Sequence, residues 1–286
     1  MWYNHCQEVI LSFWPLILSF VLSALIAWGG YQKRSLSRSG VAGAIVLGTI
    51  TFGLGGWIWG LLLIAFFVSS SFLSRYREAE KEGLAEKFAK GHQRDLGQAL
   101  ANGGLGAILA VFYFWRPNPL LFAAFVGTMA TVNADTWGTE VGILWGRRVW
   151  LITTGRPVPP GTSGGLSWPG TLAALGGAAF IGGLAALFQG VGAAGASPAP
   201  GLLLAGGVVG GLAGALADSW LGATVQCIYF CPRCAKETER PLHHCGTRTQ
   251  QVRGIRWLHN DGVNLAASAV GALAAGLLAA AALGGA

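Results

Sequence analysis

Long apolar runs separated by short polar stretches dominate this sequence of 286 residues. A helix that crosses a bilayer needs about 17–25 mostly apolar residues, and in hydrocarbon only helices and closed barrels satisfy their own backbone hydrogen bonds. The pattern therefore predicts an all-α fold, a polytopic transmembrane helix bundle that forms a single domain over residues 1–286. About eight helices are expected, at residues 9–29, 41–54, 57–73, 97–115, 119–145, 168–190, 201–225 and 261–284.

The distribution of charge predicts an orientation for this bundle. Only 11% of the residues are charged, against roughly 25% in soluble domains. Eighteen of the 19 Lys and Arg residues lie in four polar stretches, residues 30–40, 74–96, 146–167 and 226–260. Because Lys and Arg mark cytoplasmic loops, we expect the N-terminus outside and these stretches inside, with 74–96 as a helix that extends the third run. The net charge of +7 then reports orientation, and no nucleic acid partner is expected.

One apolar run carries ionisable residues. Within residues 119–145 the chain reads Thr131-Val-Asn-Ala-Asp135-Thr-Trp-Gly-Thr-Glu140. An ionisable group at the centre of a membrane helix costs about 2.5–3.5 kcal/mol on insertion scales and is tolerated when it faces the bundle interior or a wet cavity. The alternative is that Asp135 and Glu140 only pair with basic groups at the helix end. We interpret the stretch as the centre of a functional site.

Under the predicted topology, other polar side chains fall at the same inner ends of their helices. A shared end predicts one acidic cavity that opens to the cytoplasm, although Asn102 also fits a close helix contact and Asp261 a helix cap. Asp218 continues a row of small residues at four-residue spacing, which favours close helix packing. The polar residues are Asn102, Asp218, Asn260, Asp261 and Asn264, and the row of small residues is Gly206, Gly210 and Gly214.

A loop rich in Gly, Ser and Thr precedes the sixth run. It contains Thr162, Ser163, Gly164 and Gly165 and leads to Ser167, which is placed to cap the following helix. Free backbone N–H groups at such a loop bind phosphate, although a plain turn has the same composition. Positive charge from Arg147, Arg148 and Arg156 lies in the same stretch. The arrangement is not a Walker A motif.

Residues 227–256 form a Cys/His-rich cytoplasmic insert between the seventh and eighth helices. Cys231, Cys234, His243 and Cys245 have the spacing of a zinc knuckle and would close a tetrahedral site. Cys227 or His244 could replace one ligand, and free thiols are the alternative. No open catalytic coordination position is evident, so we expect any Zn²⁺ here to be structural.

The predicted helices contain several acidic residues but no Lys or Arg within the membrane to neutralise them. A bound cation is therefore expected beside these acids. Carboxylate and amide oxygens suit Mg²⁺, which commonly bridges to substrate phosphates. Mg²⁺, a phosphate loop and an apolar surround together predict phosphoryl transfer on a lipid.

The motifs as a set resemble a known family. They are Asn133-Ala-Asp-Thr-Trp-Gly-Thr-Glu140, Pro160-Gly-Thr-Ser-Gly-Gly-Leu-Ser167, Ala217-Asp-Ser219, Gly222-Ala-Thr-Val-Gln226, Asn260-Asp-Gly-Val-Asn264 and the Cys/His insert. Together they resemble transmembrane protein 19 and the plant and cyanobacterial phytyl-phosphate kinase of vitamin E (tocopherol) synthesis. That family is in turn similar to CTP-dependent polyprenol kinases and CDP-diacylglycerol synthases.

The resemblance implies a kinase that converts phytyl phosphate, an isoprenoid monophosphate, to phytyl diphosphate with a nucleoside triphosphate, and CTP is the expected donor. It implies that Asp135 and Asp218 hold Mg²⁺ and that Thr162 to Gly165 form the phosphate loop. Asn102, Glu140, Asn260 and Asp261 match polar motif residues of the family. Arg156 is expected to stabilise the charge of the transferred phosphoryl group, and Ser167 is expected to complete the nucleotide-binding loop.

Two rival functions remain open at this stage. A CDP-alcohol-forming cytidylyltransferase would release pyrophosphate, and a proton- or cation-coupled transporter would carry polar groups through the whole membrane depth. The expected location is a bacterial plasma or thylakoid membrane with the site facing the cytoplasm. Expected partners are the isoprenoid phosphate, the nucleotide and membrane lipid, and a homodimer is left open.

Overall fold

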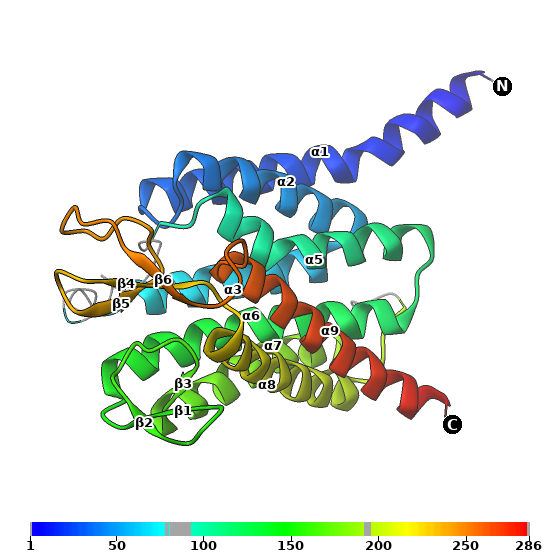
Figure 1. The fold of residues 1–286 in the computed structure, drawn as a ribbon. Helices are drawn as coiled ribbons and strands as arrows, with labels where there is room; N and C mark the ends of the chain where they lie inside the picture. Colours follow the sequence, from blue (N-terminus) through cyan, green and yellow to red (C-terminus); the bar gives the residue numbers. More distant parts are fainter. Residues whose placement is uncertain (1, 78–79, 81–92, 192–195, 285–286) are drawn as a thin grey trace.

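The computed structural model describes residues 2–77, 80, 93–191 and 196–284, with side chains from Trp14 onward. Its described part contains eight long helices, which confirms the predicted helical bundle (Figure 1). Most of the helix predicted over 74–96 lies outside the described residues. The helices are α1 (Trp2–Gln32), α2 (Arg38–Gly55), α3 (Trp57–Arg75), α5 (Leu96–Trp115), α6 (Pro119–Trp145), α7 (Trp168–Gly190), α8 (Pro200–Thr224) and α9 (Asn260–Gly284).

Short polar side chains fix where several helices begin. Ser37 accepts a hydrogen bond from the Gly40 amide at the start of α2, and Ser167 does the same for Gly170 at the start of α7. Asp95 and Gln98 form a reciprocal capping box at the start of α5. Such caps satisfy backbone donors that have no partner inside the helix, so the predicted helix starts have a local chemical cause.

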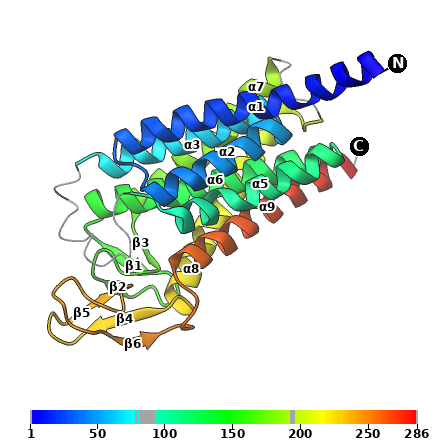
Figure 2. The ribbon, with the colours of Figure 1, turned by 90° about the horizontal axis from the view of Figure 1, so that it is seen from above.

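The helices run along one common direction, and the two termini lie at the same end (Figures 1 and 2). Two small sheets lie at the opposite end, which we call the sheet end. One sheet joins α6 to α7 with strand order β2-β1-β3, and the other joins α8 to α9 with order β5-β4-β6. The strands are β1 (Val149–Leu151), β2 (Pro157–Val158), β3 (Gly165–Leu166), β4 (Ile228–Cys231), β5 (Lys236–Thr238) and β6 (Gln250–Arg253).

These sheets were not predicted, because strands of two to four residues carry no readable alternation. They nevertheless lie in two of the four basic stretches, 146–167 and 226–260. The predicted clustering of these loops at one end of the bundle is therefore seen in the fold.

Helix α6 is the interior helix of the bundle. From Phe122 to Ala134 nearly every residue is buried, and α6 packs against α3, α5, α7, α8 and α9. Of the eight helices in the described residues, seven are long and apolar enough to cross a membrane, and α6 is the one that does not meet this criterion. Its polar residues can be accommodated because neighbouring helices, and not lipid, surround it.

An aromatic cluster fills the half of the bundle that lies away from the sheets. The ring of Trp59 on α3 stacks on Phe125 of α6 with a centroid distance of 4.3 Å. Tyr113 of α5 and Phe122 of α6 also contact Trp59, at 4.9 and 5.5 Å. Large apolar rings thus fill this half, whereas Asp135 and Asp218 lie toward the sheet end.

Glycines bring α6, α8 and α9 into backbone contact. A β-carbon placed on Gly210 of α8 would lie 2.7 Å from the carbonyl oxygen of Gly271 on α9 and 3.1 Å from the α-carbon of Gly127 on α6. One turn further, Gly214 of α8 lies directly against the side chain of Thr131. The Thr131 hydroxyl donates to the carbonyls of Gly127 and Gly210 over 2.9 and 3.2 Å. The predicted close packing of the glycine row is therefore present.

Replacement of Gly214 by Val is expected to destabilise the bundle. The added methyl groups would enter the space of the Thr131 side chain, and overpacking of this kind costs about 1–3 kcal/mol. Thermal unfolding in detergent should show a lower midpoint for Gly214→Val. The control is Gly183→Val on α7, where no atom lies within 4 Å of the added carbon. Equal losses in both variants would show that helix propensity, and not packing, sets the effect.

Candidate active site

The glycine contacts place Asp135 and Asp218 in one layer. Helices α6 and α8 run in the same direction, and Gly127 lies opposite Gly210 while Thr131 lies opposite Gly214. Both pairs have the same sequence offset, so the next turn sets Asp135 opposite Asp218. The charge of Asp135 acts repulsively on Asp218, and both side chains are half-buried. The two acids predicted to work together are thus brought together.

Helix α9 contributes Asn264 to the same place. With its amide nitrogen turned toward α8, Asn264 donates to Asp218 Oδ2 over 2.9 Å. In the opposite orientation the nitrogen lies 3.3 Å from Asn102 Oδ1 on α5. Asn264 therefore lies between Asn102 and Asp218. The predicted residues Asn260 and Asp261 lie one turn earlier, half-buried in the first turn of α9.

The predicted phosphate loop lies on the end of α8, one turn beyond Asp218. Gly164 has a φ of 83° and so occupies the left-handed region that favours glycine. A β-carbon on Gly164 would lie 2.6 Å from the Ser219 carbonyl oxygen, so only glycine lets the loop approach α8 this closely. The hydroxyl of Thr162 donates to the Pro159 carbonyl over 2.6 Å, and the Gly165 amide donates to the Thr162 carbonyl over 2.9 Å.

A hydrogen-bonded chain links this loop to the Cys/His insert. The Ser163 hydroxyl donates to Gln226 Oε1 over 2.8 Å, and Gln226 Nε2 donates to Glu239 Oε1 over 2.8 Å. Gln226 is only 2% exposed. The charge of Glu239 also acts on Asp218. Glu239 is therefore a candidate third acid of the site, linked to the loop through Gln226. Sequence reasoning missed it because nothing in the pattern of the insert separates it from a solvated charge.

Glu140 belongs to a different side of α6 from Asp135. Five residues at about 100° each turn the helix by about 500°, so the two side chains point about 140° apart around α6. The charge of Glu140 acts on Arg94. Arg94 donates to the hydroxyls of Ser71 and Ser70 over 2.8 and 2.9 Å. Burial lowers the pKa of Arg94 to about 10, with Glu140 acting in the opposite direction, so the guanidinium stays charged at neutral pH.

Two further predicted residues lie apart from the acids. Arg156 is exposed beside the turn between β1 and β2, where Gly155 has a φ of 66°. Ser167 is 7% exposed and caps α7. The cap accounts for the burial of Ser167 without a ligand, and the phosphate contacts expected of both residues stay predictions.

Sequence reasoning assigned no separate role to Asn133, whose side chain joins three helices. Its Oδ1 accepts from Ser69 of α3, and its Nδ2 donates to the Gly177 carbonyl of α7, both over 2.9 Å. Asn133 is fully buried, and these two hydrogen bonds give its amide oxygen and nitrogen a partner each. The side chain thereby connects α6 to α3 and α7. It holds α6 in register two residues before Asp135.

The insert brings together the four expected Cys and His ligands. The ligand atoms of Cys231, Cys234, His243 and Cys245 all lie within 4.8 Å of one another, a group that could hold a metal ion. Hydrogen bonds with Thr247 and His243 lower the pKa of the Cys245 thiol to about 5. The hydrogen bond with Cys245 raises the pKa of Cys234 to about 11. Within the described residues, this group does not contain Cys227 or His244.

The donor atoms around Asp218 fit a hard divalent cation. Asp135, Asp218 and Glu239 supply carboxylate oxygens, and hard cations such as Mg²⁺ prefer oxygen ligands. In the part of the chain that the structure describes, no Lys or Arg forms an ion pair with Asp135 or Asp218. Two neighbouring carboxylates, those of Asp135 and Asp218, would be stabilised by a bound divalent ion.

The charge of Glu239 is expected to strengthen divalent cation binding at Asp218. Glu239→Gln keeps an acceptor for Gln226 but removes the negative charge, and we expect about a tenfold weaker affinity for Mn²⁺ as a Mg²⁺ substitute. Electron paramagnetic resonance titration of the purified protein measures this affinity. The control is Glu237→Gln on the exposed face of β5, which should bind Mn²⁺ as the unaltered protein does. An unchanged affinity in Glu239→Gln would remove Glu239 from the site.

Comparison with known proteins places this chain among membrane proteins. Protein PGR of Arabidopsis thaliana is 35% identical over 268 residues, which cover 87% of this chain and 91% of that protein. An uncharacterized membrane protein of Synechocystis, sll0875, is 35% identical over 222 residues, or 74% of this chain and 79% of that protein. Protein VTE6, chloroplastic, of Arabidopsis thaliana is 33% identical over 166 residues, or 56% of this chain and 48% of that protein. No solved structure matches this chain.

The family assignment made from the motifs is confirmed by a match that spans nearly the whole chain. The pattern of the family described as integral membrane protein DUF92 matches residues 21–272, which run from within α1 into α9 and include both sheets. The chain therefore belongs to the integral membrane protein family DUF92.

Proposed function

We propose that this protein is an integral membrane kinase that transfers a phosphoryl group from a nucleoside triphosphate, with CTP as the expected donor, to an isoprenoid monophosphate such as phytyl phosphate. The observation that carries the proposal is the placement of Asp135 and Asp218 in one layer at the sheet end. The motif resemblance to phytyl-phosphate kinases and the identity to Protein VTE6 support the reaction class.

In this reaction an oxygen of the acceptor phosphate attacks the γ-phosphorus of the donor. The bond from that phosphorus to the β-bridging oxygen breaks, and the nucleoside diphosphate leaves with the electron pair. The acceptor is already anionic, so no general base is required, and catalysis depends on positioning and charge stabilisation. Asp135 and Asp218, with Glu239, would hold Mg²⁺, which when bound supplies charge neutralisation between phosphates.

The loop from Thr162 to Gly165 would contact the phosphates of the nucleotide. Gly164 holds this loop against α8 one turn beyond Asp218, which supports a phosphate site beside the metal ligands. Arg156, on the exposed turn of the same segment, is available to neutralise the nucleotide. The sheet end would face the cytoplasm, since the basic stretches lie there.

Asp135→Asn and Asp218→Asn are each expected to lower turnover by at least about a thousandfold while the protein still inserts and unfolds at a similar temperature. Purified protein would be incubated with Mg²⁺, phytyl phosphate and labelled CTP, and the products separated. Phytyl diphosphate with CDP supports the kinase, whereas pyrophosphate with a CDP-linked lipid indicates the cytidylyltransferase. Normal turnover in both variants would contradict the metal role of this pair.

We also propose that the Cys/His group of the insert holds structural Zn²⁺. A zinc–sulfur bond of about 2.3 Å gives a sulfur–sulfur separation of about 3.8 Å in a tetrahedral site, and the sulfurs of Cys231 and Cys245 are 3.7 Å apart. Ala235 has a φ of 50°, which turns the chain back directly after Cys234. Four ligand atoms in this arrangement leave no position for substrate.

Cys231→Ser is expected to remove most of the zinc from the purified protein, because a hydroxyl is a poor zinc ligand at neutral pH. Metal content per chain is measured by inductively coupled plasma mass spectrometry. Cys227→Ser is the control, since Cys227 is buried but lies outside the ligand group. Full zinc content in Cys231→Ser, or equal loss in both variants, would argue against the proposed ligand set.

A further inference from the structure

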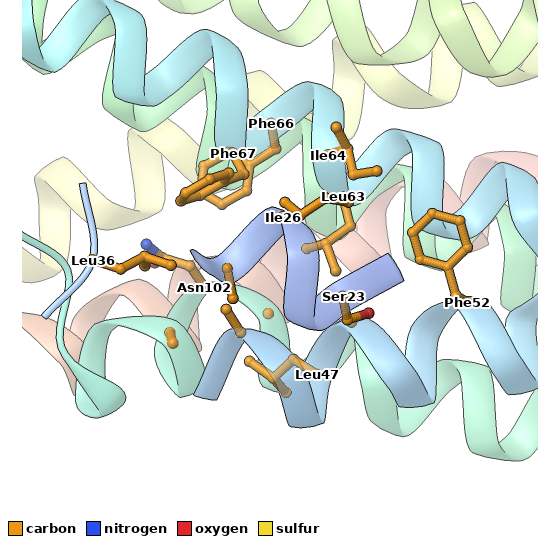
Figure 3. A pocket seen from close by; sticks show the side chains of 15 residues that line it. Ser23, Ile26, Leu36, Leu47, Phe52, Leu63, Ile64, Phe66, Phe67 and Asn102 are labelled. Atoms are coloured by element: carbon orange, nitrogen blue, oxygen red, sulfur yellow. The ribbon is translucent and has the colours of Figure 1, made fainter. Parts of the chain in front are cut away.

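An apolar cavity lies between α1, α2, α3 and α5, beside the proposed active site (Figure 3). Its volume is about 80 Å³, and 13 of its 15 lining residues are apolar or glycine. Figure 3 shows Leu36 and Asn102 at one end and Phe52 at the other, with Leu63 on the wall between them. Protein interiors are packed to the density of organic crystals, so a cavity with this apolar lining is a candidate binding site for an apolar group.

The end of the cavity nearest the sheets carries a cation. The guanidinium of Arg94 lies over the rings of Phe66 and Phe67, with centroid distances of 5.4 and 5.8 Å, and both rings line the cavity. Leu36, another lining residue, pairs with Arg94 through a backbone bridge. An amphiphile with an apolar chain and an anionic head would match this distribution, with its head at Arg94.

The same end is joined to the acidic site. Asn102 lines the cavity and lies next to Asn264, whose amide also reaches Asp218. A head group at Arg94 and Asn102 would thus be adjacent to the layer of Asp135 and Asp218. Asn102 therefore lies between the cavity and the place where the phosphoryl group would be transferred.

We infer that this cavity binds the part of the hydrocarbon chain next to the head group of a single-chain isoprenoid phosphate, with Arg94 and Asn102 at its phosphate. The identity of the head group rests on the proposed function, whereas the chain site rests on the cavity. Phe52 lies at the far end of the cavity. Arg94 is a binding residue for the acceptor, distinct from the loop that would hold the nucleotide.

Photolabelling tests the site without requiring turnover. Phytyl phosphate that carries a diazirine in its chain would be bound to the purified protein and irradiated, and the labelled residues identified by mass spectrometry. We expect adducts on residues that line the cavity, and at least a tenfold loss of this labelling in Leu63→Trp, which fills the cavity. Val68→Trp on the same helix, at a residue that is 56% exposed, should label as the unaltered protein does.

A second readout tests the head group. Arg94→Gln should weaken labelling by phytyl phosphate about tenfold while labelling by the matching diazirine-bearing phytol stays unchanged. Equal weakening of both probes would show that Arg94 only supports the structure, and the assignment of Arg94 would fail.

The outcomes separate this inference from the proposed function. Cavity labelling without nucleotide-dependent turnover would keep the chain site and overturn the kinase. Turnover with adducts only on lipid-facing residues would overturn the chain site and leave the kinase proposal intact. The same holds if an excess of phosphatidylglycerol vesicles abolishes cavity labelling as readily as an excess of phytyl phosphate does.

Discussion

The backbone contact between α6, α8 and α9 is the constraint on which the rest of the structure depends. Gly127, Gly210 and Gly271 remove the side chains that would otherwise keep these helices apart. Thr131 fills the next layer and donates hydrogen bonds within α6 and to α8. Without hydrophobic driving force inside a bilayer, close packing of small residues is what holds helices together. The layer beyond Thr131 is the layer of Asp135 and Asp218.

The buried position of α6 follows from the same contacts. An interior helix can carry Asn133, Asp135 and Thr131 because each meets protein and not lipid. The aromatic cluster around Trp59 closes the other half of the bundle. The loop from Thr162 to Gly165, the insert and the start of α9 converge at the sheet end, toward which Asp135 and Asp218 lie.

Much of this fold could be predicted from the pattern of apolar residues. The bounds of α6 and α7 agree with the predicted runs, because each has a capping residue and a Pro at its start. The glycine row on α8 indicated close packing and led to Asp218. The sheets and the hydrogen bonds of Glu239 and Arg94 could not be predicted, because they depend on contacts between segments distant in the sequence. The separation of Glu140 from Asp135 follows from helix geometry alone, yet the motif suggested one site.

The central claim is that Asp135 and Asp218 hold one divalent ion between them. An experimental structure of the protein with bound Mn²⁺, with anomalous scattering collected at the manganese edge, tests this most directly. We expect one peak within about 2.0–2.4 Å of a carboxylate oxygen from each acid, on the side that faces Glu239. Apolar side chains packed between the two carboxylates, or manganese bound only elsewhere, would contradict the account.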